Sequence, residues 1–140
     1  HTTIETCGHY PTDVLDQACR VLDALIFDIK CLDSARHKKA TGGGSELILK
    51  NIGHVFEHFP DLPVLIRTPV IPGFNDTEED ILGIREMIPR KANIRYEALT
   101  YHRMGQPKYG YLGRRYELEG VKADEAFMKR LNIMLKSYEK

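Results

Sequence analysis

A short, mostly apolar run near the start of the chain limits the folds that the sequence can adopt. Residues 24–30 read Ala-Leu-Ile-Phe-Asp-Ile-Lys. Such a run suits a strand buried on both faces, as in a parallel sheet. Comparable strand patterns lie at residues 64–70 and 94–100, and a shorter β-branched one lies at residues 2–5. The sequence therefore predicts four strands.

Helical patterns separate these strands. Pro11 opens the first helix, a short one covers residues 34–40, and Ser45 is placed to cap the next. Asp76 and Glu79 have the spacing of a capping box for the helix that follows residues 64–70. We expect a long loop from residue 101 to about residue 120 and then a last helix.

Strands that alternate with helices are typical of parallel sheets with right-handed crossovers. No domain boundary interrupts the pattern, so we expect residues 1–140 to form a single domain of the α/β class. Four such units make part of a TIM-like (β/α) barrel, which needs more strands to close. Because the chain opens in mid-pattern at His1, we expect the missing strands to precede it.

Composition narrows the function classes. Twenty basic residues balance twenty acidic ones, which disfavours binding to nucleic acid or to an anionic membrane. No apolar run approaches membrane-spanning length and no signal-peptide pattern is present, so we expect a cytoplasmic protein. Cys7, Cys19 and Cys31 form no C-x-x-C pair, and we interpret them as free thiols rather than metal ligands.

Two charges lie inside the predicted strand at residues 24–30. Side chains alternate along a strand, so Asp28 and Lys30 share one face, toward its carboxyl end. In parallel α/β folds that end carries the ligand site. A simple ion pair at the strand end is the competing interpretation.

The other predicted strands repeat the pattern. Arg67 interrupts residues 64–70, Glu5 and Thr6 close the first strand, and His102 follows the fourth. A rim that carries both signs of charge suits a zwitterionic ligand, such as an amino acid or a cofactor containing one. S-Adenosylmethionine (SAM) is one candidate.

Four motifs, in order along the chain, resemble those of radical SAM enzymes that activate glycyl radical enzymes. They are Ile-Glu-Thr-Cys-Gly at residues 4–8, Phe-Asp-Ile-Lys at residues 27–30, Ile-Arg-Thr-Pro-Val-Ile-Pro-Gly-Phe-Asn-Asp at residues 66–76, and Tyr-His-Arg-Met-Gly at residues 101–105. The last motif resembles the branch of the family that contains the pyruvate formate-lyase activating enzyme. Together the motifs span nearly the whole chain.

The resemblance implies the C-terminal part of a radical SAM (β/α)₆ barrel with SAM at its carboxyl rim. By position, Glu5 and Thr6 lie near the methionine moiety, and Asp28 and Lys30 contact its polar groups. Glu5, Thr6 and Asp28 are also placed to hold a monovalent cation. The rest of the pocket is lined by Arg67, Pro69, Leu99 and His102, with Pro69 and Leu99 against adenine.

The resemblance further implies an oxidoreductase activity for a full-length protein. In such enzymes a reduced [4Fe-4S] cluster cleaves SAM, and the 5′-deoxyadenosyl radical takes a hydrogen atom from a glycine of a partner such as a pyruvate formate-lyase-like glycyl radical enzyme. The family's C-x-x-x-C-x-x-C loop and its Gly-Gly-Glu motif are absent from this sequence. We therefore expect the chain alone to be inactive and to have no cluster ligands. The strand at residues 2–5 has an unpaired edge, which favours self-association.

Two other functions remain open from the sequence. One is a non-catalytic half-barrel module that binds a zwitterionic small molecule or a protein. The other is an ordinary α/β-barrel enzyme that uses Asp28 and Lys30 for acid–base or Schiff-base chemistry.

Overall fold

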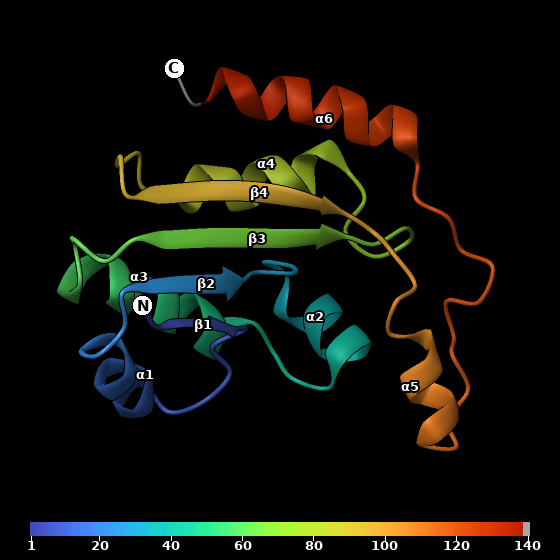
Figure 1. Cartoon of the computed structure of the whole chain (residues 1–140). Coiled ribbons are helices and arrows are strands. Elements are labelled where there is room, and N and C mark those ends of the chain that lie inside the picture. The colour runs from blue at the N-terminus through green and yellow to red at the C-terminus, as the bar shows by residue number, and fades with distance from the viewer. Residues whose placement is uncertain (139–140) are drawn as a thin grey trace.

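The protein, seen in a computed structural model that describes residues 1–138, is built on one parallel sheet of four strands. The strands are β1 (Thr3–Thr6), β2 (Ala24–Asp28), β3 (Val64–Val70) and β4 (Ile94–Thr100), and they lie side by side in chain order. All four point the same way in Figure 1, toward the side where α5 lies. The predicted α/β fold with four parallel strands is confirmed.

Helices connect the strands and follow the last one. They are α1 (Thr12–Cys19), α2 (Ser34–Thr41), α3 (Glu46–His58), α4 (Glu78–Met87), α5 (Gln106–Tyr111) and α6 (Glu125–Ser137). Helix α5 forms within the segment that the sequence predicted to be a loop. It contains no buried residue and lies beyond the strand ends in Figure 1. The apolar pattern that predicts helices is therefore absent there.

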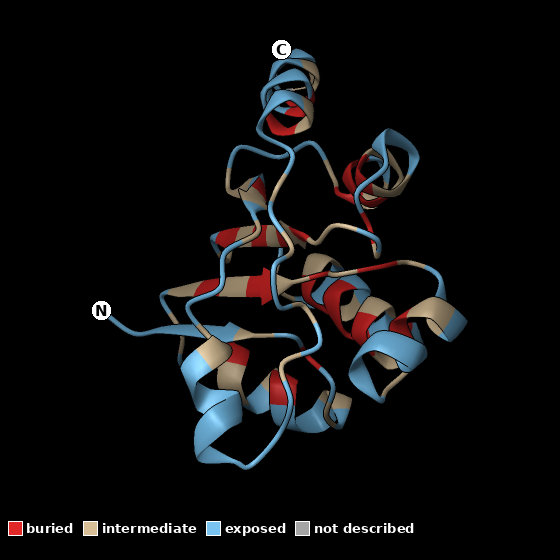
Figure 2. Cartoon of the chain, turned by 90° about the vertical axis from the view of Figure 1, so that its right-hand side faces the viewer, coloured by how far each residue is buried: buried red, intermediate tan, exposed pale blue. Residues whose placement is uncertain are grey.

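One face of the sheet carries the core. Phe27 of β2 and Ile66 of β3 are fully buried against apolar side chains of α1, α3 and α4. A second cluster joins β4 to α6, with Leu131 at its centre. Figure 2 shows the buried positions in red on the sheet and on the helices that pack against it. Burial of these side chains, at about 25 cal/mol per Å² of apolar surface, is the main force holding helices to the sheet.

The opposite face of the sheet is not covered by any described helix, and we call it the open face. It carries the alternate residues of each strand, and none of them is buried. The open face consists of Thr3, Glu5, Ala24, Ile26, Asp28, Leu65, Arg67, Pro69, Arg95, Glu97 and Leu99. The expectation that β2 is buried on both faces is thus met on one face only in the described structure.

Two predicted helix caps differ from the structure. Helix α4 is capped by Thr77, whose hydroxyl accepts from the Asp80 N–H at 3.1 Å, not by Asp76 with Glu79. Thr77 has the extended backbone that a cap requires, so the capping pattern starts one residue later than predicted. Ser45 makes no cap bond, because its hydroxyl donates to the Leu32 carbonyl at 2.8 Å.

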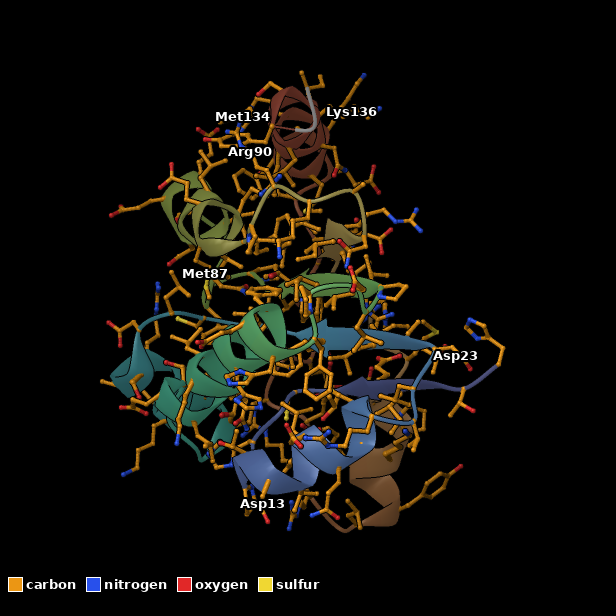
Figure 3. The ribbon with its side chains drawn as sticks, turned by 90° about the vertical axis from the view of Figure 1, so that its left-hand side faces the viewer. Asp13, Asp23, Met87, Arg90, Met134 and Lys136 are labelled. Atoms are coloured by element: carbon orange, nitrogen blue, oxygen red, sulfur yellow. The ribbon has the colours of Figure 1, made fainter. Side chains whose placement is uncertain are left out.

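At the amino ends of the strands, the chain is tied by local contacts (Figure 3). The Thr2 N–H donates to Asp23 at 2.6 Å, which joins the start of β1 to the turn before β2. The Arg90 guanidinium lies 5.8 Å from the centre of the Tyr138 ring, beneath α6.

Among residues 1–138, no helix is both long and apolar enough to cross a membrane.

Gly8 makes the close approach of the loop after β1 to the sheet possible. Its φ is +67°, and a Cβ atom there would lie 2.2 Å from Cζ of Phe27. Both observations exclude a side chain. The Gly in the Thr-Cys-Gly motif is therefore required by the backbone and by packing.

We predict that Gly8→Ala lowers the free energy of unfolding by about 3 kcal/mol, through backbone strain and overpacking. Gly53→Ala is the matched control, since Gly53 is exposed within α3 and its Cβ would meet nothing within 4 Å. The control should raise the free energy of unfolding by about 0.5–1 kcal/mol. Denaturant titration measures both, and a Gly8→Ala protein as stable as the parent would contradict this account of the turn.

Candidate functional site

Four charged residues of the predicted site meet on the open face, at its carboxyl end. Arg67 of β3 pairs with Glu5 of β1 and lies with its Nε 3.5 Å from Asp28 Oδ1. Lys30, just after β2, places its Nζ 3.4 Å from the other oxygen of Asp28. The structure therefore brings these four residues into one network of alternating charge.

The contacts of Asp28 with Lys30 and Arg67, at the centre of the network, are long. Contacts of 3.4–3.5 Å are longer than the 2.7–2.9 Å typical of charge-assisted hydrogen bonds. Asp28 Oδ1 and Arg67 Nε are buried and have no hydrogen-bond partner in the described structure. Because buried polar atoms are normally hydrogen-bonded, these two atoms are incompletely satisfied in the described structure.

Strand register sets the order of groups across the open face. Asp28 is paired with Arg67, and Arg67 with Glu97, so one row carries acid, base and acid. The adjacent row pairs Pro69 with Leu99 and is apolar. The charged row and the apolar row lie next to each other, as a ligand with a charged end and a flat apolar end requires.

Glu97 was missed by the sequence analysis. It is exposed on the open face, and the alternation of β4 that places Leu99 there also places Glu97 there. The same reasoning that identified Asp28 and Lys30 from their shared face could have found it.

Two predicted site residues lie apart from the network. Thr6 follows Glu5, so its side chain leaves β1 on the opposite side, where its hydroxyl accepts from the Gly8 N–H at 3.0 Å. His102 lies past the end of β4 and is exposed. The structure places Thr6 in the turn that shapes the rim and His102 at the edge of the rim.

Asn51 of α3 holds the loop after β1. Its side chain is fully buried, and its amide donates to the Gly8 and Tyr10 carbonyls at 2.7 and 2.8 Å. Its carbonyl oxygen accepts from the Thr12 hydroxyl at 2.7 Å. All its principal hydrogen-bonding groups are thus used on the segment that follows Glu5 and Thr6.

Strand β2 ends at Asp28, two residues before the predicted end at Lys30. Beyond Asp28 the carbonyls are paired with side chains instead of with β3: Ile29 O accepts from the Thr68 hydroxyl at 2.7 Å, and Lys30 O from the Asn75 amide at 2.7 Å. The chain therefore continues along β3 without a regular ladder.

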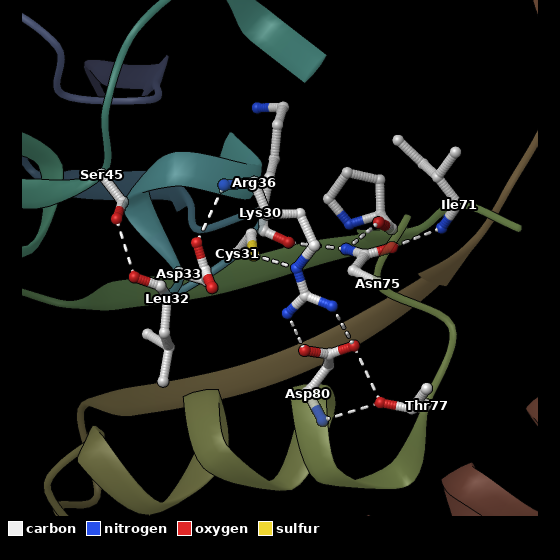
Figure 4. Close-up of polar contacts among 11 residues, drawn as sticks. Lys30, Cys31, Leu32, Asp33, Arg36, Ser45, Ile71, Asn75, Thr77 and Asp80 are labelled. Atoms are coloured by element: carbon white, nitrogen blue, oxygen red, sulfur yellow. Dashed lines mark hydrogen bonds and ion pairs between the residues drawn. The ribbon is translucent and has the colours of Figure 1, made fainter. Parts of the chain in front are cut away.

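The segment after Lys30 is also anchored to α4 (Figure 4). The Arg36 guanidinium pairs with Asp80 through both of its terminal nitrogens, and its Nε donates to Cys31 Sγ at 3.2 Å. The Asp80 carboxylate raises the pKa of Arg36 above its ordinary value, so this cation stays charged. The pair fixes the start of α2 next to the candidate site.

The described residues do not fit an iron–sulfur cluster. Cys19 and Cys31 are buried and Cys7 is exposed, and all three are free thiols. Within residues 1–138 no group of three or more His, Cys, Asp or Glu side chains could hold a metal ion. The site that these residues do form is the charged network on the open face.

We predict that Arg67→Met lowers the free energy of unfolding by about 1–2 kcal/mol, because it leaves the partly buried Asp28 and the more exposed Glu5 without this partner. Arg20→Met is the control, because it removes an exposed pair with Asp16 one turn away on α1 and should cost about 0.5 kcal/mol or less. Equal losses in denaturant titrations would contradict a central role for Arg67.

Comparison with curated proteins finds relatives over the whole chain. It is 99% identical over 140 residues to the (2S)-3-sulfopropanediol sulfolyase activating enzyme of Bilophila wadsworthia (strain 3_1_6), covering all of this chain and 46% of that protein. It is 43% identical over 135 residues to the isethionate sulfite-lyase activating enzyme of Nitratidesulfovibrio vulgaris, covering 96% of this chain and 44% of that protein. The chain thus spans a little under half the length of these relatives. No family model matches it.

Comparison with solved structures agrees with the comparison with curated proteins. A domain of the pyruvate-formate lyase-activating enzyme from Bacteroides vulgatus ATCC 8482 superposes with a TM-score of 0.73 at 26% sequence identity, covering 99% of this chain and 76% of that one. Choline trimethylamine-lyase and 4-hydroxyphenylacetate decarboxylase activating enzymes are also similar, at 35% and 34% identity. The relatives that match this chain are thus glycyl-radical-enzyme activating enzymes, the family that its four motifs resemble.

Proposed function

We propose that this chain is the SAM-binding part of an enzyme that generates a glycyl radical on a partner protein. The observation that carries the proposal is the charged network on the open face, in which buried Asp28 Oδ1 and Arg67 Nε face each other at 3.5 Å and have no hydrogen-bond partner in the described structure. The relatives at 34–99% identity, all activating enzymes, support the activity. The oxidoreductase reaction belongs to a full-length protein that contains this chain.

The residues of the network are suited to a zwitterion. Lys30 and Arg67 attract the SAM carboxylate, while Asp28 and Glu5 attract its ammonium group. The resemblance also implies that Glu5, Thr6 and Asp28 hold a monovalent cation beside that carboxylate, and we include this cation in the proposal. The ion pairs already present keep these side chains on the open face, so that less ordering is needed when the ligand binds.

The apolar row completes the pocket. Pro69 and Leu99 are half-buried neighbours and offer a flat surface to adenine. His102, at the edge of the rim, closes the adenine end. When bound, the [4Fe-4S] cluster and SAM supply the radical chemistry, whereas the residues of this chain orient SAM and exclude water from it.

The partner that the proposal assigns is a glycyl radical enzyme. The 99% identity to a sulfolyase activating enzyme favours a sulfolyase over a pyruvate formate-lyase, whose activating enzyme matches at only 26%. Three free cysteines are consistent with a reducing, cytoplasmic location. We further propose that residues 1–140 act as one domain, and that the edge of β1, where Ile4 is exposed, pairs with another strand or copy.

The chain alone is expected to form no glycyl radical. Its sequence contains no C-x-x-x-C-x-x-C loop, and its three cysteines do not converge. The proposal therefore assigns to this chain the binding of SAM, and not the cleavage of SAM.

Calorimetric titration with SAM tests the proposal in a full-length protein that contains this chain and a reconstituted cluster. Lys30→Met should weaken binding about 10- to 100-fold, since it removes a charged hydrogen-bond donor from the ligand. Lys39→Met, on the exposed side of α2, is the matched control and should bind like the parent. If Lys30→Met binds SAM as tightly as the control does, the site has been assigned to the wrong residues.

Electron paramagnetic resonance distinguishes the activating enzyme from a non-catalytic binding module. The reduced full-length protein, given SAM, should produce a glycyl radical signal on a sulfolyase partner and a much weaker one on a pyruvate formate-lyase. A signal on neither partner, from a protein that binds SAM, would favour the binding module. A stronger signal on pyruvate formate-lyase would contradict the proposed partner.

A further inference from the structure

The backbone at Lys30 is held by a side chain rather than by the sheet. Strand β2 has ended at Asp28, yet the Lys30 carbonyl accepts a 2.7 Å hydrogen bond from the Asn75 amide. The same amide donates to the Pro69 carbonyl at 2.9 Å. Asn75 therefore bridges the ends of β2 and β3, at two residues that the proposed SAM pocket contains.

Asn75 is itself fixed in place. Its side chain is fully buried, and its oxygen accepts from the Ile71 N–H at 2.7 Å. Its own N–H donates back to the Ile71 carbonyl at 3.3 Å, which closes the turn after β3. The side chain lies between Lys30 and Ile71 in Figure 4.

The segment that follows Lys30 is anchored by hydrogen bonds that do not involve Asn75. Cys31 Sγ accepts from Arg36, and the Leu32 carbonyl accepts from Ser45 at 2.8 Å. The Asn75 bond is the anchor that acts on the Lys30 backbone, whereas the Lys30 ammonium group contacts Asp28 at 3.4 Å. Loss of this bond alone should therefore release Lys30 while α2 stays in place.

We propose that Asn75 is a positioning residue for SAM binding, acting through Lys30; this inference rests on the proposed function. By holding the Lys30 carbonyl, Asn75 sets where the Lys30 ammonium group lies relative to Asp28. Without it, the Lys30 and Pro69 carbonyls lose their partner and the backbone must move to reach water or another donor. SAM then has to order Lys30 as it binds, which lowers affinity without removing any ligand contact.

The test is SAM titration of the full-length, cluster-loaded protein with Asn75→Ser, Lys30→Met and the double variant. Asn75→Ser should weaken SAM binding about tenfold. The double variant should bind no more weakly than Lys30→Met, because a residue that acts through Lys30 has nothing left to act on, and Pro69 remains held by the ladder that pairs it with Leu99.

Asn93→Ser is the matched control. The Asn93 side chain also donates to two carbonyls, those of Pro60 and Leu62, at 3.0 and 2.8 Å, but it lies before β4, at the amino end of the strands. Asn93→Ser should lower the melting temperature and leave SAM affinity unchanged. If Asn75→Ser does not fold, Asn75→Asp takes its place, since it keeps the oxygen that accepts from the Ile71 N–H and removes the amide that donates to the Lys30 and Pro69 carbonyls. It should behave as Asn75→Ser does in both backgrounds.

Each outcome decides the inference. Three results would overturn it while leaving the SAM site intact. They are parent-like SAM affinity in Asn75→Ser, losses of SAM affinity that multiply in the double variant, and a loss of SAM affinity in Asn93→Ser equal to that in Asn75→Ser. Parent-like affinity in Lys30→Met would instead overturn the assignment of Lys30 to the SAM site, and this inference with it.

Discussion

The carboxyl rim of this sheet depends on how the carbonyl groups at the strand ends are paired. A parallel strand that leaves its ladder exposes backbone groups, and buried groups of this kind must find partners. Here Thr68 and Asn75 supply them for the two residues beyond β2, and Asn51 supplies them for the loop beyond β1. These three buried polar side chains let the chain leave the sheet at defined places while the charged residues remain on the open face.

The sheet therefore has one face whose side chains stabilise the fold and another, the open face, that is available for binding. The face turned to the helices holds nearly all the buried apolar side chains, so burial there stabilises the fold. The open face is charged and its central contacts are long, so its ion pairs add little net stability, although removing one partner leaves the others uncompensated. Side chains that are positioned but not fully paired are ready to exchange partners with a ligand. This is the physical basis for assigning SAM to the open face.

The resemblance of the motifs has a structural explanation in several places. The Gly of the first motif is required by a positive φ and by the ring of Phe27. Asn75, in the Pro-Gly-Phe-Asn-Asp turn, is required by three hydrogen bonds. Asp28, Lys30 and Arg67 are instead partly exposed, and their place follows from strand register. The motifs therefore combine residues that build the rim with residues that we propose face the ligand.

The sequence predicted the sheet well because alternate side chains of a strand lie on opposite faces, so the alternation of apolar and polar residues follows burial. The bounds of β3 and β4 agree with the predicted runs, and the shared face of Asp28 and Lys30 follows from alternation. Helix α5 was not predicted because it buries nothing. Asn51 and Asn75 were not predicted as supports because a polar residue in a sequence does not show whether it is buried. The early end of β2 was missed for the same reason, since its last carbonyls are paired by those side chains.

A structure of a full-length protein containing this chain, with SAM and its cluster bound, tests the central claim most directly. The account predicts the SAM carboxylate within hydrogen-bond distance of Lys30 or Arg67, its ammonium group facing Asp28 or Glu5, and adenine against Pro69 and Leu99. SAM bound away from the open face, with the Glu5–Arg67–Asp28–Lys30 network undisturbed, would contradict it.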